Sequence, residues 1–157
     1  PVIRIVLLAL LAASFPVPEA VWSWPTEGAH VIIRDYRAPL TPWGAGHRGV
    51  DLAASGTRVT APTSGIVSFS GHVVDRSVVS ITTSEGWIIS MEPVEPLVQT
   101  GQWVSKGDLV GALQEGHCDQ LCLHLGLRIE GSYRSARREL GVLQRAVLLP
   151  VWSQALG

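Results

Sequence analysis

Residues 121–130 alternate between apolar and polar side chains, and this pattern constrains the fold more than any other in the chain. The odd positions hold Leu121, Leu123, Leu125, Leu127 and Ile129. Successive side chains of a β-strand point to opposite faces, so the alternation predicts a strand with one face on a hydrophobic core. His124 then stands on the non-core face, where the small Gly126 leaves room beside it.

Short strand-like runs with turn residues between them make up most of the chain before residue 134, without a convincing helical period. We predict strands over residues 31–34, 58–61, 65–74, 77–83, 87–92, 103–104, 109–113 and 123–130. Asp75-Arg76 and Ser84-Glu85-Gly86 are the expected hairpin turns. Regularly spaced short strands predict an all-β domain, a sandwich or barrel-like hybrid of antiparallel strands. A short C-terminal helix is expected over residues 135–149, where apolar residues share a helical face.

The 157 residues fit a single domain, preceded by an export signal and an irregular lead-in. A basic start at Arg4, an apolar run over residues 5–15 and a small residue at Ala20 predict a signal peptide over residues 1–21. The apolar run is too short to span a bilayer, and a buried core helix is the alternative. Residues 22–46 are rich in Trp, Pro and Gly, so we expect an irregular segment that buried aromatic side chains pin to the domain.

The domain proper is expected over residues 47–157. Its formal net charge of −1 and the lack of a basic stripe exclude nucleic acid as a partner. We expect a monomer that is exported, either secreted or associated with the cell envelope, and that has no membrane span after signal removal.

One short motif supplies two candidate metal ligands. In residues 46–51, Gly-His-Arg-Gly-Val-Asp, the side chains of His47 and Asp51 stand four positions apart, and zinc accepts imidazole nitrogen and carboxylate oxygen. Residues four apart in a straight strand lie roughly 13 Å from each other. The segment must therefore bend for both to reach one ion, and Gly46 and Gly49 allow the bend. Alone, such a pair is more often a surface feature.

Together with His124, this motif resembles the lysostaphin or LytM-type zinc endopeptidases, which cut peptide bonds in bacterial peptidoglycan. The resemblance covers residues 43–128 and includes the following segments. Residues 47–54 are similar to the family's His-x-x-x-Asp segment, and residues 56–62 and 64–67 are similar to the two strands that follow it. Residues 98–111 are similar to a late Gly-x-x-Val-x-x-Gly hairpin of the family. Leu123-His124 is similar to the end of the family's His-x-His motif. The resemblance implies one zinc ion held by His47, Asp51 and His124, and a zinc-bound water that attacks an amide of a peptidoglycan peptide.

Two further histidines of that family, which handle the water and stabilise the tetrahedral intermediate, are replaced in this chain. Their positions fall on Pro93 and Cys122, and neither side chain can take the place of an imidazole in proton transfer. Glu92 and His117 are candidate catalytic stand-ins, because Glu92 adjoins a vacated position and His117 precedes the ligand strand. His72 is a further possible stand-in, although we expect it on an outer strand surface.

Cys118 and Cys122 are the two cysteines of the chain, and two interpretations stay open. A disulfide is favoured in an exported protein, although residues 118–122 must then turn tightly. The alternative is a closed metal site made by Cys118, Cys122 and His124.

The favoured function is a zinc metalloendopeptidase that acts on peptidoglycan peptides. The alternative is a catalytically degenerate module that holds zinc and docks on the cell wall or on a cell-wall protein. A third hypothesis places a prosthetic group on Lys106, in a hairpin similar to those of biotinyl and lipoyl carriers. Export and the neighbours Ser105 and Gly107 argue against it.

Overall fold

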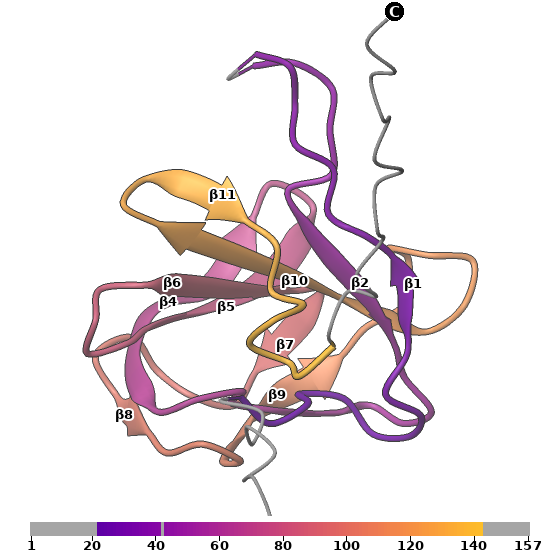
Figure 1. Ribbon diagram of the computed structural model, residues 1–157. Coiled ribbons are helices and arrows are strands. Elements are labelled where there is room, and N and C mark those ends of the chain that lie inside the picture. The colour runs from indigo at the N-terminus through magenta and orange to yellow at the C-terminus, as the bar shows by residue number, and fades with distance from the viewer. Residues whose placement is uncertain (1–21, 42, 143–157) are drawn as a thin grey trace, which may run out of the picture.

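The computed structural model describes residues 22–41 and 43–142, and all the regular elements within them are β-strands (Figure 1). The predicted export signal lies outside the described residues. Among those residues, no helix has the length and apolar character needed to cross a membrane. The prediction of an all-β fold is confirmed.

Eight antiparallel strands form the larger sheet, in the order β1-β2-β10-β6-β5-β4-β8, with β11 paired to β10. Their bounds are β1 Ile32–Arg34, β2 Gly49–Ala53, β4 Gly65–Val73, β5 Arg76–Thr82, β6 Ile88–Glu92, β8 Trp103–Val104, β10 Cys122–Ile129 and β11 Ser132–Arg134. The smaller sheet has the order β3-β9-β7, with β3 Arg58–Thr60, β9 Leu109–Leu113 and β7 Val94–Pro96. The larger sheet is open and does not close into a barrel.

Strand β10 lies between β2 and β6 in the larger sheet, and its inner face is the centre of the core. Leu123, Leu125 and Leu127 are almost completely buried, as the alternating pattern predicts. Leu125 pairs with Val50 on one side and Met91 on the other, and both are fully buried. Burying each such side chain contributes about 1.5–3 kcal/mol, so β10 is a rigid support for whatever its outer face carries.

Three strands, β2, β7 and β11, are absent from the strands predicted from the sequence, and each absence has a physical reason. Strand β2 is buried on both faces between β1 and β10, so its residues lack a polar alternation. Strand β7 is short and contains Pro96, which an edge strand tolerates because one side of it needs no amide donor. Strand β11 has only three residues, all exposed.

The turn between β4 and β5 lies one residue earlier than predicted. Val73 pairs with Arg76, so Val74 and Asp75 form a two-residue hairpin loop. Val74 has a φ of 58°, a left-handed conformation that a β-branched residue rarely adopts.

The predicted C-terminal helix is wrong in its described part, because residues 135–142 form only a single turn. Gly141 has a φ of 74°, and its amide donates to the carbonyl of Arg138. The amide of Val142 donates to the carbonyl of Arg137, and this pair of bonds is a Schellman motif that ends helical winding. The remainder of the predicted helix lies outside the described residues.

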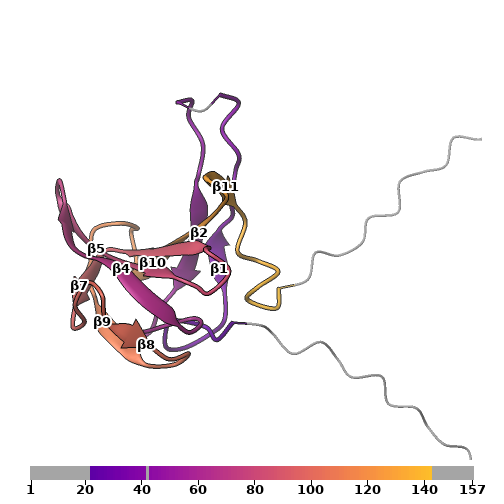
Figure 2. The same ribbon diagram turned by 90° about the vertical axis from the view of Figure 1, so that its left-hand side faces the viewer.

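The lead-in packs on the domain through Trp22 and Trp24. Trp22 is buried, and the indole of Trp24 donates to the carbonyl of Leu140 over 3.2 Å. Between β1 and β2, residues 35–41 and 43–48 form an arm that projects from the sheets (Figures 1 and 2). Trp43 near its tip is 96% exposed, so this tryptophan does not pin the lead-in as we expected of its aromatic residues.

Candidate metal centre

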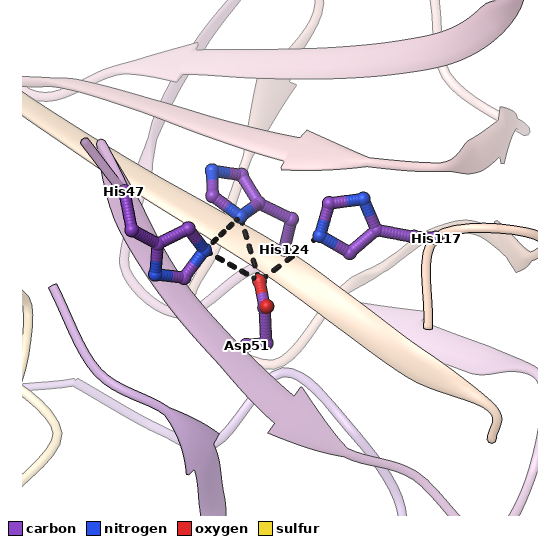
Figure 3. Close-up of side chains that lie close together, drawn as sticks. All are labelled: His47, Asp51, His117 and His124. Carbon is purple, nitrogen blue, oxygen red and sulfur yellow. Dashed lines mark hydrogen bonds and ion pairs between the residues drawn. The ribbon is translucent and has the colours of Figure 1, made fainter. Parts of the chain in front are cut away.

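Four side chains converge on one point at the outer face of the larger sheet (Figure 3). Asp51 comes from β2, His124 from β10, His47 from the segment before β2, and His117 from the loop between β9 and β10. The Oδ1 atom of Asp51 lies 3.0 Å from His47 Nε2, 3.0 Å from His117 Nε2 and 2.7 Å from His124 Nδ1. The four potential ligand atoms all lie within 4.8 Å of one another.

Strand register brings Asp51 and His124 together. In the antiparallel β2–β10 pair, the two residues are direct cross-strand partners, so their side chains emerge on the same face. His47 lies outside β2, at the base of the arm, where its backbone exchanges two hydrogen bonds with Arg37. The hydrogen bonds of the arm therefore position His47, whereas the β2 ladder positions Asp51.

Gly49 allows close packing between β2 and the His124 side chain. Its φ is not in the left-handed region, and a Cβ at this position would lie 2.6 Å from His124 Nε2 and 2.5 Å from the carbonyl oxygen of Leu125. Such distances are severe overlaps. The absence of a side chain at Gly49 is what allows the His124 ring to lie beside β2.

The tautomer of His47 is determined by a backbone carbonyl. His47 Nδ1 lies 2.7 Å from the carbonyl oxygen of Asp35, which can only accept, so Nδ1 carries the hydrogen. In a neutral ring, the lone pair on Nε2 then faces Asp51 Oδ1 at 3.0 Å and His124 Nδ1 at 3.2 Å. Facing acceptors repel each other unless a proton or a metal cation lies between them.

The donor set fits a zinc ion by its chemistry. Zinc prefers imidazole nitrogen and carboxylate oxygen, at bond lengths of about 2.0–2.2 Å. A ligand histidine characteristically donates its other N–H to a backbone carbonyl, as His47 does to Asp35. His47, Asp51 and His124 are the residues that could hold the metal, and His117 is within reach of the same point.

Asp51 is a buried anion. Burial raises its pKa, but hydrogen bonds from His124 and His117 and the charges of His47 and His124 outweigh that effect and lower the pKa to about 2. The carboxylate is therefore charged at every physiological pH. A buried charge of this kind is tolerated only with close opposite charges or a metal ion around it.

The structure places the candidate catalytic stand-ins His117 and Glu92 differently with respect to the cluster. His117 reaches the cluster, whereas Glu92 does not belong to it. Glu92 pairs with His124 across the β6–β10 register, but its carboxylate lies 3.5 Å from the guanidinium of Arg76. His72 is exposed on β4, as expected. No spacing rule identifies His117 as a member of the site, and its place before the strand that carries His124 was the signal that made it a candidate.

Cys118 and Cys122 form a disulfide, as the favoured interpretation predicts, and their Cα atoms are 6.0 Å apart. The described residues contain no free cysteine. The alternative thiolate site with His124 is therefore wrong, because both sulfur atoms are already bonded to each other. Since Cys122 is the first residue of β10, the disulfide ties the loop that carries His117 to the strand that carries His124.

A hollow of about 370 Å³ is lined by His47 and by neighbouring residues of the arm. Two further hollows lie near the cluster. One of about 160 Å³ is lined by Asp75, Arg76, Pro93, His117 and the three residues that precede His117. The other, of about 280 Å³, opens on the outer face of the sheet, two residues along β10 from His124. Its lining includes Phe69, Ser80, Ser90, Gly126, Arg128 and Tyr133.

Comparisons with known proteins agree with this geometry. The chain matches the profile of Peptidase family M23 over residues 45–136. An uncharacterised protein of Mycobacterium tuberculosis is 41% identical over 119 residues, which are 73% of this chain and 48% of that protein. The chain thus spans about half the length of the curated relatives that it matches.

Solved structures share the fold. The catalytic domain of the antimicrobial peptidase lysostaphin from Staphylococcus simulans has a TM-score of 0.60 and 19% identity, over 71% of this chain and 92% of that chain. A zinc-containing peptidase from Vibrio cholerae has a TM-score of 0.57 and 20% identity, over 69% of this chain and 36% of that chain.

Proposed function

Because this chain belongs to peptidase family M23, we propose that it is a zinc-dependent peptidase domain that acts on peptidoglycan peptides. The observation that carries the proposal is the convergence of His47, His124 and Asp51 on one point from three positions in the fold. The zinc-containing and antimicrobial peptidases of similar fold support the metal and the class of reaction. An export signal over residues 1–21 would deliver the domain to the cell envelope, where this substrate lies.

Each of these residues has a distinct task in holding the metal. Asp51 supplies a negative charge in a buried position, which favours a divalent cation. His47 presents an unprotonated Nε2 because the carbonyl of Asp35 holds the hydrogen on Nδ1. His124 stands on β10, whose inner face is buried in the core. When bound, zinc supplies polarisation of a carbonyl and lowers the pKa of water.

The hollow of about 280 Å³ on the outer face of the sheet is an argument for a peptide as the substrate. Gly126, Ser90 and Ser80 are neighbours across β10, β6 and β5, and the two serine hydroxyls share a hydrogen bond of 2.9 Å. An extended peptide along β10 would pass His124 and reach Arg128 roughly 13 Å further on. Arg128 makes no ion pair with any described residue, so its guanidinium is available to a substrate carboxylate.

A catalytically degenerate zinc-holding module is the second candidate, and a specific observation favours it. The positions of the family's other two histidines hold Pro93, which has no titratable group, and Cys122, whose sulfur is in the disulfide. Loss of one transition-state donor typically costs about 10²–10³ in rate. Such a module would bind the wall or a cell-wall protein and cut nothing.

One experiment separates the two candidates. The full chain is assayed for bound zinc and for release of soluble fragments from purified peptidoglycan, beside Asp51→Ala and the control Asp108→Ala at an exposed carboxylate outside the cluster. Zinc with release that requires Asp51 supports the peptidase. Zinc without release supports the module, and absence of zinc from the unmodified chain contradicts both.

A further inference from the structure

We propose that His117 is a fourth protein ligand, which closes the zinc site in the resting protein. The inference rests on the proposed zinc site and concerns how many of its positions the protein itself occupies. It does not depend on whether the domain hydrolyses peptides.

Geometry gives His117 the same relation to the site as His47. Both present Nε2 to the same oxygen of Asp51, and both do so at 3.0 Å. Their rings flank the His124 ring at nearly equal centroid distances, 4.9 Å for His47 and 5.1 Å for His117. Figure 3 shows the two rings on opposite sides of the Asp51 carboxylate. A cation drawn to His47, Asp51 and His124 therefore meets the His117 nitrogen as well.

The chemistry of the donor set agrees with a closed site. Structural zinc sites have four protein ligands, whereas catalytic sites keep one position open for water or substrate. This chain carries Pro93 and a disulfide-bonded Cys122 in place of the two family histidines that act on that water. It carries instead a third imidazole directed at the ligand point. The loss of the two family histidines and the gain of the His117 imidazole as a metal donor both fit a site that holds zinc without an open position for water.

The loop that carries His117 has few polar or covalent contacts with the rest of the described fold. Residues 115–120 are exposed except for His117 and Cys118, which are half-buried. The described contacts of this loop with the rest of the fold are the disulfide to Cys122 and the hydrogen bond and ring contact of His117. The hollow of about 160 Å³ beside Pro93 adjoins His117. With the ring moved away from the ligand point, one position would be open to water or substrate, while the disulfide would keep the loop nearby.

The test counts ligands on the metal-loaded chain. X-ray absorption at zinc should report three imidazoles in the unmodified chain and two in His117→Ala. Zinc affinity, measured by competition with a chelator, should fall by about 10-fold or more. In the cobalt-substituted chain, azide should leave the visible spectrum unchanged, whereas it should bind to cobalt in His117→Ala.

His30→Ala is the matched control, because His30 stacks on Trp24 rather than joining the cluster. His117→Gln serves as a second variant if the alanine variant folds poorly. Two imidazoles at zinc in the unmodified chain, or the same azide response with and without His117, would overturn the proposal. Absence of peptidoglycan fragments in every variant would contradict the peptidase function alone, since the ligand count is read without substrate.

Discussion

His124 and Asp51 face each other across the β2–β10 pair, with His124 Nδ1 only 2.7 Å from Asp51 Oδ1. The contact joins two neighbouring inner strands of the larger sheet, so the buried core beneath these strands supports both candidate ligands. Because the carboxylate is buried, the effects of changing it should be large and specific.

Replacing Asp51 by Asn removes the charge and keeps the shape. Zinc affinity should fall by about 100-fold or more, since even a supporting group of a metal site is commonly worth 10–100-fold. The measurement is chelator competition, with Asp108→Asn as the control at an exposed carboxylate outside the cluster. Unchanged affinity in Asp51→Asn would remove this residue from the ligand set.

Acid should destabilise the metal-free protein through Asp51. Its pKa in the folded chain is about 2, below the ordinary value of 3.8, so the carboxylate stabilises the fold above pH 4. This contribution is lost as the pH falls from 3.8 towards 2. Urea unfolding of the metal-free chain and of Asp51→Asn should therefore give free energies whose difference shrinks over that range. A difference that grows with acid would contradict the lowered pKa.

Gly49 and Gly126 are cross-strand partners, and they offer a matched pair of substitutions. Gly49→Ala places a methyl group 2.6 Å from His124 Nε2, and overpacking of this kind costs about 1–3 kcal/mol. It should also weaken zinc binding, because the His124 ring must shift. In Gly126→Ala the nearest atoms lie at 3.8–3.9 Å, so stability and zinc affinity should change little. Equal effects of the two substitutions would show that the close packing at Gly49 has no role.

The left-handed conformation of Val74 should be relieved by glycine. Val74 is fully exposed, so Val74→Gly loses no packing and should raise the free energy of unfolding by about 1 kcal/mol. Val73→Gly in the adjoining strand should lower it by about 0.5–1 kcal/mol, because glycine is unfavourable in a strand. Thermal or urea unfolding of both variants should show that the free energy of unfolding rises in Val74→Gly and falls in Val73→Gly.

The Cys118–Cys122 disulfide should act on zinc binding through His117. Replacing both cysteines by serine should cost about 2 kcal/mol of stability, as expected for so short a loop. It should also weaken zinc binding, because His117 is then less firmly held. Adding His117→Ala to the double variant should produce a smaller further loss than His117→Ala does alone. Fully additive losses of zinc affinity would show that the disulfide does not act on zinc binding through His117.

Several features could be predicted from the sequence because they depend on local pattern. The alternation of residues 121–130 predicted a strand with His124 on its outer face, since side chains of a strand change face at every residue. The order of motifs predicted that His47, Asp51 and His124 would meet, and two cysteines in a chain expected to be exported favoured a disulfide.

Other features depend on contacts between segments far apart in the chain, and only the tertiary structure decided them. Strand β2 is buried on both faces, so its sequence carries no alternation to detect. Glu92 adjoins a vacated position, yet Arg76 holds its carboxylate away from the cluster. His117 meets Asp51 across 66 residues of sequence. Spacing along the chain limits which side chains can share a site, but the direction in which each one points depends on the strand register and on the charges that surround it.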